Sequence, residues 1–338
     1  MSIAKNVFYG AARLIPLKLL RKKQTDSILL PYHHLVSDKE VPHIKHLYPY
    51  KGVKAFEKDL DYLLKNFKTV TLTEVIGTVK AGTSLPDNAF LLTFDDGLRE
   101  VNETIAPLLL RKGVPAAFFL NSAFIDNKEL FYKFKVSLII DSLNTGKHSQ
   151  AVLERLAQVL KAQDTTTLIP AVKKISYHNR QLAEEAGTIL GLSFEEYLKQ
   201  QRPFMSSDEI GTLVQQGFAI GGHSIDHPYY TQLSLEQQLK QTLDSVNFLT
   251  ERFHIPYRAF AFPHSDAGVS REFFEKILNM KDGLDVIFGT ANHKRDIFPQ
   301  ILHRFNCERP AIDITSAVKG ILLYNKVQES RNKNVIAR

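Results

Sequence analysis

Two short stretches of the chain carry residue types that can bind a metal ion and move protons. The first is Asp95-Asp96, a pair of adjacent carboxylates followed by Gly97, and the second holds His223 and His227, two imidazoles four residues apart. Two neutral imidazoles and one carboxylate supply three metal ligands and leave positions for water and substrate, which is the pattern of a catalytic site. The remaining carboxylate can act as a general base. Together the two stretches predict metal-assisted hydrolysis of an amide or ester.

Each stretch directly follows a predicted strand. Residues 89–94 lead into the carboxylates, and residues 218–220 lead through two glycines into the histidines. Such strands alternate with helical patterns along much of the chain, which is typical of parallel β-α units. The predicted strands are residues 27–32, 69–72, 89–94, 115–120, 218–220, 258–262, 285–288 and 300–304. About six or seven β-α units are enough to close a barrel, so the sequence predicts an α/β barrel with its chemistry at one rim.

The alternation stops between residues 124 and 203, where the apolar spacing is helical and no strand is predicted. Because this stretch is too long for a structureless loop, we expect a helical insertion that caps the carboxyl ends of the strands. The predicted organisation is a barrel built from residues 27–123 and 204–324. A basic helical segment over residues 1–26 precedes it, and a basic tail over residues 325–338 follows it.

Composition excludes several classes of protein. Hydrophobic residues make up 44% of the chain and charged residues 23%, so it can bury a substantial core and is not disordered. A single cysteine, Cys307, excludes an internal disulfide and a cysteine-rich zinc site, and we expect it to lie in the core. The net charge of +7 gathers at the two ends of the chain. A nucleic-acid groove needs its basic residues on the folded face, so we expect no nucleic-acid partner.

The location of the protein is inferred from its first residues. No apolar run approaches the ~18 residues of a membrane-spanning helix, and residues 1–23 lack the order of regions that defines a signal peptide. We therefore expect a cytoplasmic protein. The apolar residues of this segment fall at helical spacing among basic residues, which leaves peripheral contact with the inner face of the membrane open. The alternative, which we favour, is a helix packed on the domain with its charges in solvent.

The two stretches resemble the signatures of a known family. Residues 93–97, Thr-Phe-Asp-Asp-Gly, match the first signature of the polysaccharide deacetylases, and residues 223–227, His-Ser-Ile-Asp-His, match the second. This family is carbohydrate esterase family 4, also described as the nodulation-factor deacetylase homology domain. The resemblance implies a deformed (β/α)7 barrel, TIM-like in outline. It also implies an enzyme that removes N-acetyl groups from an amino sugar in a polysaccharide, an oligosaccharide or a glycan precursor.

Carried onto this chain, the resemblance assigns a role to each side chain. Asp95 is the general base, and Ser224 positions the loop that bears the histidines. The metal ligands are Asp96, His223 and His227. These ligand types suit Zn²⁺, and Co²⁺ or Ni²⁺ are alternatives.

The third signature of the family departs from its usual pattern. It normally has an arginine two residues before a proline, where the arginine orients and tunes the base, and aligning it on Pro263 puts Ala261 there. We keep Arg258 as the candidate support for the base, although the alternation of a strand turns it to the other face. Residues 260–263, Phe-Ala-Phe-Pro, resemble a branch of the superfamily with aromatic-Ala-aromatic-Pro at this point. We assign Pro263 and His264 to the substrate-binding wall.

The general acid has two candidates. The aromatic-Ala-aromatic-Pro branch often begins with a strand ending Tyr-His-x-Val, in a circularly permuted barrel whose early histidine is the acid. Residues 32–35, Tyr-His-His-Leu, fit with Leu for Val and indicate His33. The more usual arrangement has the acid late, in Leu-x-His, and residues 301–303 match this in part and indicate His303. Of the two we prefer His33.

The missing arginine leaves a second function open, from a different class. A barrel without it could bind carbohydrate and have lost turnover. This alternative predicts ligand binding without release of acetate.

Overall fold

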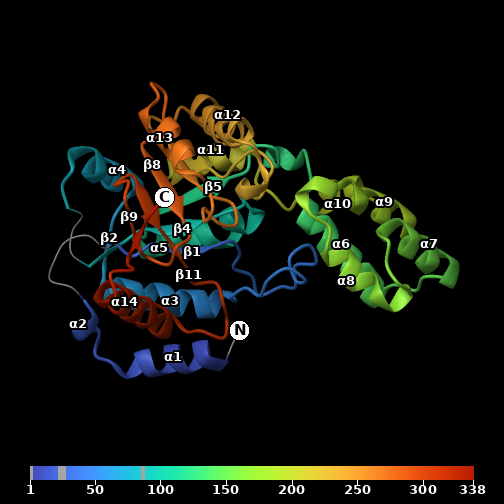
Figure 1. Ribbon diagram of the computed structural model, residues 1–338, viewed down its shortest axis with the longest axis horizontal. Helices are drawn as coiled ribbons and strands as arrows, with labels where there is room; N and C mark the ends of the chain where they lie inside the picture. Colours follow the sequence, from blue (N-terminus) through green and yellow to red (C-terminus); the bar gives the residue numbers. More distant parts are fainter. Residues whose placement is uncertain (1–2, 22–27, 85–87) are drawn as a thin grey trace.

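The computed structural model describes residues 3–21, 28–84 and 88–338. At its centre eight strands form one sheet in the order β10-β8-β7-β6-β5-β4-β1-β11, and every neighbouring pair is parallel (Figure 1). The strands are β1 (Pro31–His33), β4 (Leu92–Phe94), β5 (Ala116–Leu120), β6 (Ala219–Gly222), β7 (Ala259–Ala261), β8 (Val286–Gly289), β10 (Ile301–His303) and β11 (Phe305–Asn306). Only Arg304 separates the two edge strands, β10 and β11, so the chain itself joins the edges of the sheet. The fold is the predicted α/β barrel, nearly closed.

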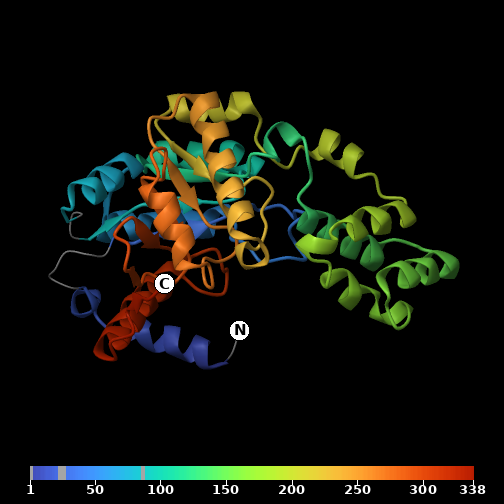
Figure 2. The same cartoon turned by 45° about the horizontal axis from the view of Figure 1, so that its top comes forward.

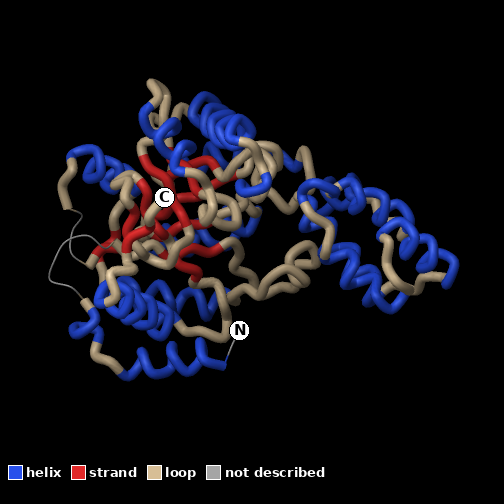
Figure 3. Tube along the Cα trace, in the orientation of Figure 1, coloured by secondary structure: helices blue, strands red, loops and turns tan. Residues whose placement is uncertain are grey.

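Helices cover the outside of the barrel (Figures 1 and 3). They are α3 (Val53–Asn66), α4 (Leu72–Ala81), the π-helical turn η1 (Val101–Ile105) with α5 (Ala106–Lys112), α11 (Ser207–Gln215), α12 (Leu235–Phe253), α13 (Arg271–Asn279) and α14 (Ile314–Ser330). A capping box opens α11, since Ser206 and Glu209 each accept a hydrogen bond from the other's backbone N–H. Gly82 and Gly113 end α4 and α5 in the left-handed conformation.

The strands are buried on both faces, because helices cover the outer face and the barrel interior encloses the other. Successive side chains of a strand point to opposite faces. Phe118 of β5 therefore packs on Phe94 in the layer under the helices, whereas the next residue, Phe119, packs on Phe288 in the interior. Cys307 is buried in the outer layer, which confirms the expectation from the sequence.

Five helices between β5 and β6 form a lobe at one side of the barrel, drawn in green in Figure 1. They are α6 (Tyr132–Thr145), α7 (Gln150–Leu160), α8 (Leu168–Lys173), α9 (Gln181–Ile189) and α10 (Phe194–Gln201). The lobe has its own apolar core, in which Phe134 and Leu156 are buried. Residues 35–48 pack against it, and His43 Nδ1 lies 2.8 Å from the Tyr197 hydroxyl. Figure 2 shows that the lobe extends sideways from the barrel instead of lying across it.

Helices α1 (Ile3–Leu14) and α2 (Leu17–Leu20) pack on α14 at one edge of the molecule. The Tyr9 ring lies so close to Gly320 of α14 that no side chain would fit there. Residues 1–2 and 22–26 of the predicted N-terminal segment, and residue 27 of the first predicted strand, lie outside the described residues. None of the described helices is both long and apolar enough to cross a membrane.

The last part of the chain is more ordered than the expected basic tail. Helix α14 continues past the predicted end at residue 324 to Ser330, and β12 (Val335–Ile336) then pairs with β9 (Arg295–Asp296). The Arg338 guanidinium is buried 2.6 Å from a carboxylate oxygen of Asp266 and 2.6 Å from one of Asp296. A further short pair, β2 (Lys68–Thr69) with β3 (Ala89–Phe90), lies beside the main sheet.

Candidate active site

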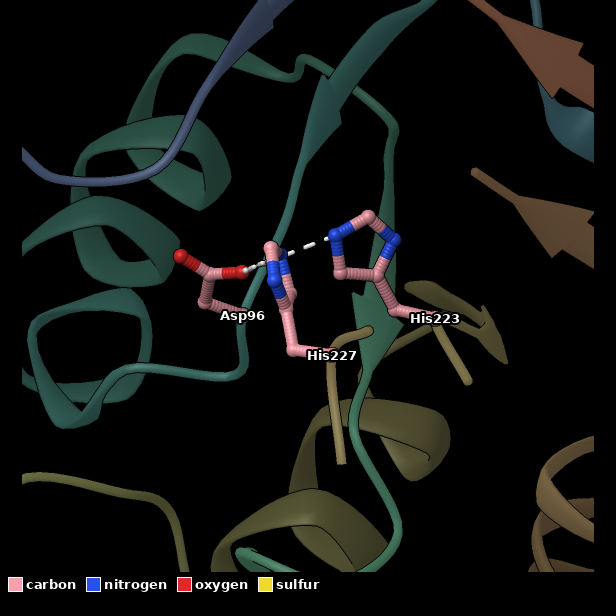
Figure 4. A group of neighbouring side chains, drawn as sticks. All are labelled: Asp96, His223 and His227. Carbon is pink, nitrogen blue, oxygen red and sulfur yellow. Dashed lines mark ion pairs between the residues drawn. The ribbon is translucent and has the colours of Figure 1, made fainter. Parts of the chain in front are cut away.

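Asp96, His223 and His227 meet just beyond the carboxyl ends of β4 and β6. Asp96 Oδ1 lies 3.5 Å from His223 Nε2 and 3.2 Å from His227 Nε2. Figure 4 shows both imidazole rings with a nitrogen turned toward the carboxylate. All three side chains are buried, and their ligand atoms lie within 4.8 Å of one another. The structure therefore brings together the three residues that the sequence predicted as metal ligands.

The backbone around these residues is folded tightly enough to require special conformations. Asp96, Ser224 and His227 have φ of 71°, 70° and 63°, in the left-handed region that non-glycine residues seldom adopt. Ser224 Oγ accepts a hydrogen bond of 3.0 Å from the backbone N–H of His227 and so holds the loop between the two histidines. The Asn121 amide also donates to the His223 carbonyl. Such strain persists where surrounding contacts enforce it, which is typical of functional sites.

The donor set fits a divalent metal ion. Asp96 Oδ1 is buried without a hydrogen-bond partner, although it lies between two imidazole nitrogens. His223 Nδ1 donates to the Ala261 carbonyl at 2.8 Å, which leaves the lone pair on Nε2, the nitrogen that faces Asp96. Burial opposes ionisation of Asp96, but the neighbouring histidines outweigh it and hold the pKa of this carboxyl far below its usual range. An ionised oxygen with no donor, beside imidazole nitrogens, is the environment that a bound cation would complete.

Asp95 is held by an arginine that the sequence analysis did not identify. Arg304 Nη1 lies 2.6 Å from Asp95 Oδ1 and Nη2 lies 2.8 Å from Oδ2, and both side chains are buried. The guanidinium lies over the rings of Tyr32 and Phe119 in the barrel interior. Burial would raise the pKa of Asp95, but Arg304 and then His223 outweigh it, so this pKa lies below its ordinary value. Asp95 is therefore an ionised carboxylate with a fixed orientation, as a general base requires.

A cavity of about 530 Å³ opens onto these residues. The barrel rim contributes Tyr32, His34, Asp95, Asp96, His223, His227, Phe262, His264 and Thr290, and the loop after β1 contributes His46, Leu47 and Tyr48. The lobe supplies one wall through Phe131, Lys133, Val136, Ile140 and Lys173. The insertion thus borders the site with one side of α6 and the end of α8, while the rest of it lies to the side.

His34 is a further titratable group that lines this cavity. Its Nδ1 lies 2.8 Å from Glu308 Oε2, and Glu308 Oε1 accepts hydrogen bonds from the backbone N–H groups of His34 and Leu35. Burial disfavours the charged imidazole, but the adjacent Glu308 carboxylate outweighs this and raises the pKa of His34 to about 10. His34 is therefore protonated at neutral pH.

Comparison with known proteins agrees with this geometry. The family model described as polysaccharide deacetylase matches residues 82–279, which is more than half of the chain. The chain belongs to the polysaccharide deacetylase family. It is a carbohydrate deacetylase. No curated protein sequence is significantly similar to it.

Solved deacetylase structures share its fold. Streptococcus pyogenes deacetylase PplD, in complex with acetate, is 11% identical, with a TM-score of 0.56 over 88% of this chain and 99% of that one. IcaB from Ammonifex degensii is 16% identical, with a TM-score of 0.53 over 88% and 98%. A de-N-acetylase from Aggregatibacter actinomycetemcomitans is 14% identical, with a TM-score of 0.54 over 88% and 100%. At sequence identities this low, the likeness establishes that this chain has the same fold as these proteins.

The structure places both predicted general acids outside the cavity. His33 points to the outer layer, where its ring packs on Phe56 and Phe94, and burial lowers its pKa well below the usual value. His303 lines a different cavity, with Nε2 3.0 Å from Asp296 Oδ2. Because neighbouring residues of a strand face opposite ways, a one-residue shift brings His34 into the cavity in place of His33. The motif did not decide between the two, since Tyr32 directly precedes His33, whereas Val36 stands two residues after His34.

Of the residues predicted to bind substrate or to support the base, only one lines the cavity. His264 lines the cavity, with Nε2 3.2 Å from His227 Nδ1, and stacks on Tyr229 at a centroid distance of 3.6 Å. Pro263 precedes it and does not line the cavity. Arg258 lies at the amino end of β7, whereas the cavity lies beyond the carboxyl ends of the strands. There it donates to Asn247 Oδ1 and to the Gly283 carbonyl. The support that the sequence analysis assigned to Arg258 is therefore supplied by Arg304.

Proposed function

We propose that this deacetylase removes N-acetyl groups from an amino sugar, in a polysaccharide, an oligosaccharide or a glycan precursor, with a divalent metal ion held by Asp96, His223 and His227. The donor set of two imidazoles and one carboxylate suits Zn²⁺, and Co²⁺ or Ni²⁺ are alternatives. One observation carries the proposal. The ionised carboxylate of Asp95, fixed by Arg304, lies 4.0 Å from the ligand atom of His223, so a base stands beside the ligand set.

Bound at these three side chains, a divalent ion would polarise the acetamide carbonyl and increase the acidity of water. Two side chains of the protein carry out the proton transfers, one accepting a proton from water and the other donating one to the amine. Asp95 accepts a proton from the attacking water as the water oxygen adds to the carbonyl carbon. Arg304 keeps both carboxylate oxygens in place and keeps them ionised, because its two N–H groups donate one to each.

His34 is the proton donor to the departing amine in this proposal. It lines the same cavity as Asp95, and Glu308 keeps it protonated at neutral pH. As the C–N bond breaks, the imidazolium proton passes to the nitrogen, and acetate and the free amino sugar result. The preference for His34 over His33 and His303 rests on position, since neither of those two lines the cavity.

The binding-only alternative loses its main support. It rested on the absence of an arginine beside the base, and Arg304, between β10 and β11, pairs with Asp95 instead. The complete charged pair at Asp95 supports turnover over binding alone.

The deciding experiment measures acetate release from a panel of N-acetylated oligosaccharides by metal-reconstituted protein. Asp95→Asn and His223→Ala are measured beside the wild type, and Glu103→Gln, a change at an exposed residue of η1, serves as the control. The proposal expects release by the wild type and the control and none above background by the two site variants. A folded, metal-loaded wild type that releases no acetate from any N-acetylated sugar would contradict it.

A further inference from the structure

Helices α1 and α2 present one fixed surface to the outside of the molecule. Their inner side packs on α14, where Ala12 and Leu20 are buried and Tyr9 lies on Gly320. Figures 1 and 2 both place the two helices along the edge formed by α14, away from the lobe. Because the inner side is anchored, the outer side keeps a constant orientation relative to the barrel.

The ends of the two helices are held by lysines of α14. Lys319 Nζ donates to the Arg13 carbonyl at 2.7 Å, at the end of α1, and Lys326 Nζ donates to the Leu19 carbonyl at 2.5 Å, in α2. These bonds satisfy carbonyls that a helix end leaves without a partner. They also bring two further positive charges to the same edge.

The outer side carries the two most exposed large apolar side chains of the described residues. Leu14 is 85% exposed and Leu19 is 58% exposed. They lie at the end of α1 and in α2, on either side of the turn at Pro16. Two leucines this exposed within six residues of sequence keep apolar area in water that a contact would remove.

The charges that α1 and α2 themselves carry are of one sign. Residues 3–21 contain four basic residues and no acidic residue. Arg13 and Lys18 are exposed next to the leucines, and the only acid paired with either among the described residues is Asp313, 3.6 Å from Arg13 in a solvent-exposed pair. Such a pair contributes little, so both cations are available to an anionic surface.

We propose that α1 and α2 bind the surface of an anionic phospholipid membrane, with Leu14 and Leu19 entering the boundary between headgroups and acyl chains. Exposed apolar side chains flanked by basic residues are the pattern of an interfacial helix, since the apolar groups leave water while the cations face lipid phosphates. The one-sided charge favours phospholipid over a second copy of this chain, which would bring the same positive charges together. This surface is independent of the deacetylase site.

The test is co-sedimentation of the full chain with vesicles of phosphatidylcholine alone or mixed with phosphatidylglycerol. We expect the wild type to bind the mixed vesicles at least about fivefold more than the neutral ones, and to be released by salt. Leu14→Ser with Leu19→Ser should lower the bound fraction about tenfold, and Lys18→Glu about fivefold. Leu110→Ser is the matched control, because Leu110 is 45% exposed on α5 beside a basic residue, Arg111.

Thermal unfolding and acetate release from a soluble substrate are measured on every variant and should not change, since these residues lie far from the cavity lining. Wild-type protein that stays in the supernatant with anionic vesicles would overturn the proposal, as would a double variant that sediments like the wild type. Self-association that the double variant abolishes, with no vesicle binding, would assign the surface to a second copy instead. A failure of vesicle binding would contradict only the membrane proposal. A failure of acetate release would contradict only the proposed deacetylase function.

Discussion

Arg304 and Asp95 form a bidentate ion pair across 209 residues of sequence, with N–O distances of 2.6 and 2.8 Å and almost no exposure to solvent. The pair links the residue between β10 and β11 to the carboxylate that directly follows β4. Its geometry fixes the direction of both carboxylate oxygens, which a single lysine amine would not do.

Replacing Arg304 with lysine should lower kcat about 10- to 100-fold, because one amine cannot hold both oxygens of Asp95. The pKa of Asp95 is held low in the folded protein, so the base form is present above that pKa and is lost as the pH falls through it. A weaker partner raises this pKa, and the acidic limb of the kcat profile should move to higher pH. Rate profiles of the two proteins from about pH 3 to about pH 8, a range that includes the ordinary aspartate pKa of about 3.9, measure the shift. An unchanged acidic limb would mean that Arg304 does not tune the base.

Removing the charge of Arg304 altogether, in Arg304→Met, should destabilise the fold by about 3–5 kcal/mol, because it leaves the buried carboxylate of Asp95 without a partner. Asp95→Asn with Arg304→Met should recover part of that loss, since the unpaired charge is gone. Denaturant unfolding of the wild type and these two variants tests this, and equal stability of the single and double variants would argue against a buried unpaired charge.

His34→Gln should lower kcat by about 10²- to 10⁴-fold, the range expected for loss of a general acid. His33→Gln and His303→Gln should keep most of their activity per folded molecule, because neither side chain lines the cavity. The comparison requires steady-state rates normalised to the folded fraction. Loss of turnover in His33→Gln with full activity in His34→Gln would return the role to the residue first favoured from the sequence.

Glu308→Gln tests the cause of the raised pKa of His34. In the wild type this pKa is about 10, so the imidazolium is present at neutral pH and is lost only as the pH rises toward that value. Without the carboxylate the pKa of His34 should fall, and the basic limb of the kcat profile should move to lower pH. A basic limb that does not move would show that another group sets it. The folded-state pKa can be followed directly by NMR titration of the imidazole.

Asp96→Asn and Asp95→Asn should separate metal binding from turnover. Asp96→Asn removes a ligand, and we expect at least about tenfold weaker metal affinity. Asp95→Asn should keep the metal content of the wild type and lose acetate release. Elemental analysis after dialysis against a chelator and return of Zn²⁺ gives the metal content of each variant, and an acetate assay of the same samples gives its turnover. Equal metal loss in the two variants would mean that Asp95 is itself a ligand.

The sequence predicted the parts of the site that depend on local spacing. Asp95 and Asp96 follow one strand, and His223 and His227 follow another, so knowledge of the α/β alternation was enough to bring them to the same rim. The Asp96, His223 and His227 cluster lies where that reasoning put it.

Two parts of the site depended on information that spacing does not contain. The choice between His33 and His34 turns on which face of β1 is the interior, and a one-residue difference in register exchanges them. The arginine beside the base arrives from the end of β10, a strand that reaches Asp95 only after the sheet has curled round to β1. Arg258, nearer to the third signature, lies at the amino end of its strand, where no strand alternation could bring it to the carboxyl rim.

The position of Arg304 between β10 and β11 also sets an order in time. A growing chain acquires Asp95, Asp96, His223 and His227 before the residues that complete the sheet have been made, and N-terminal parts of a protein fold first during synthesis. Until residues 301–306 add their two strands, the base has no guanidinium partner and the sheet has no joined edges. Arg304 therefore both connects the two edge strands and lowers the pKa of Asp95. A nascent or truncated chain that contains every signature but lacks Arg304 would have a base without its partner.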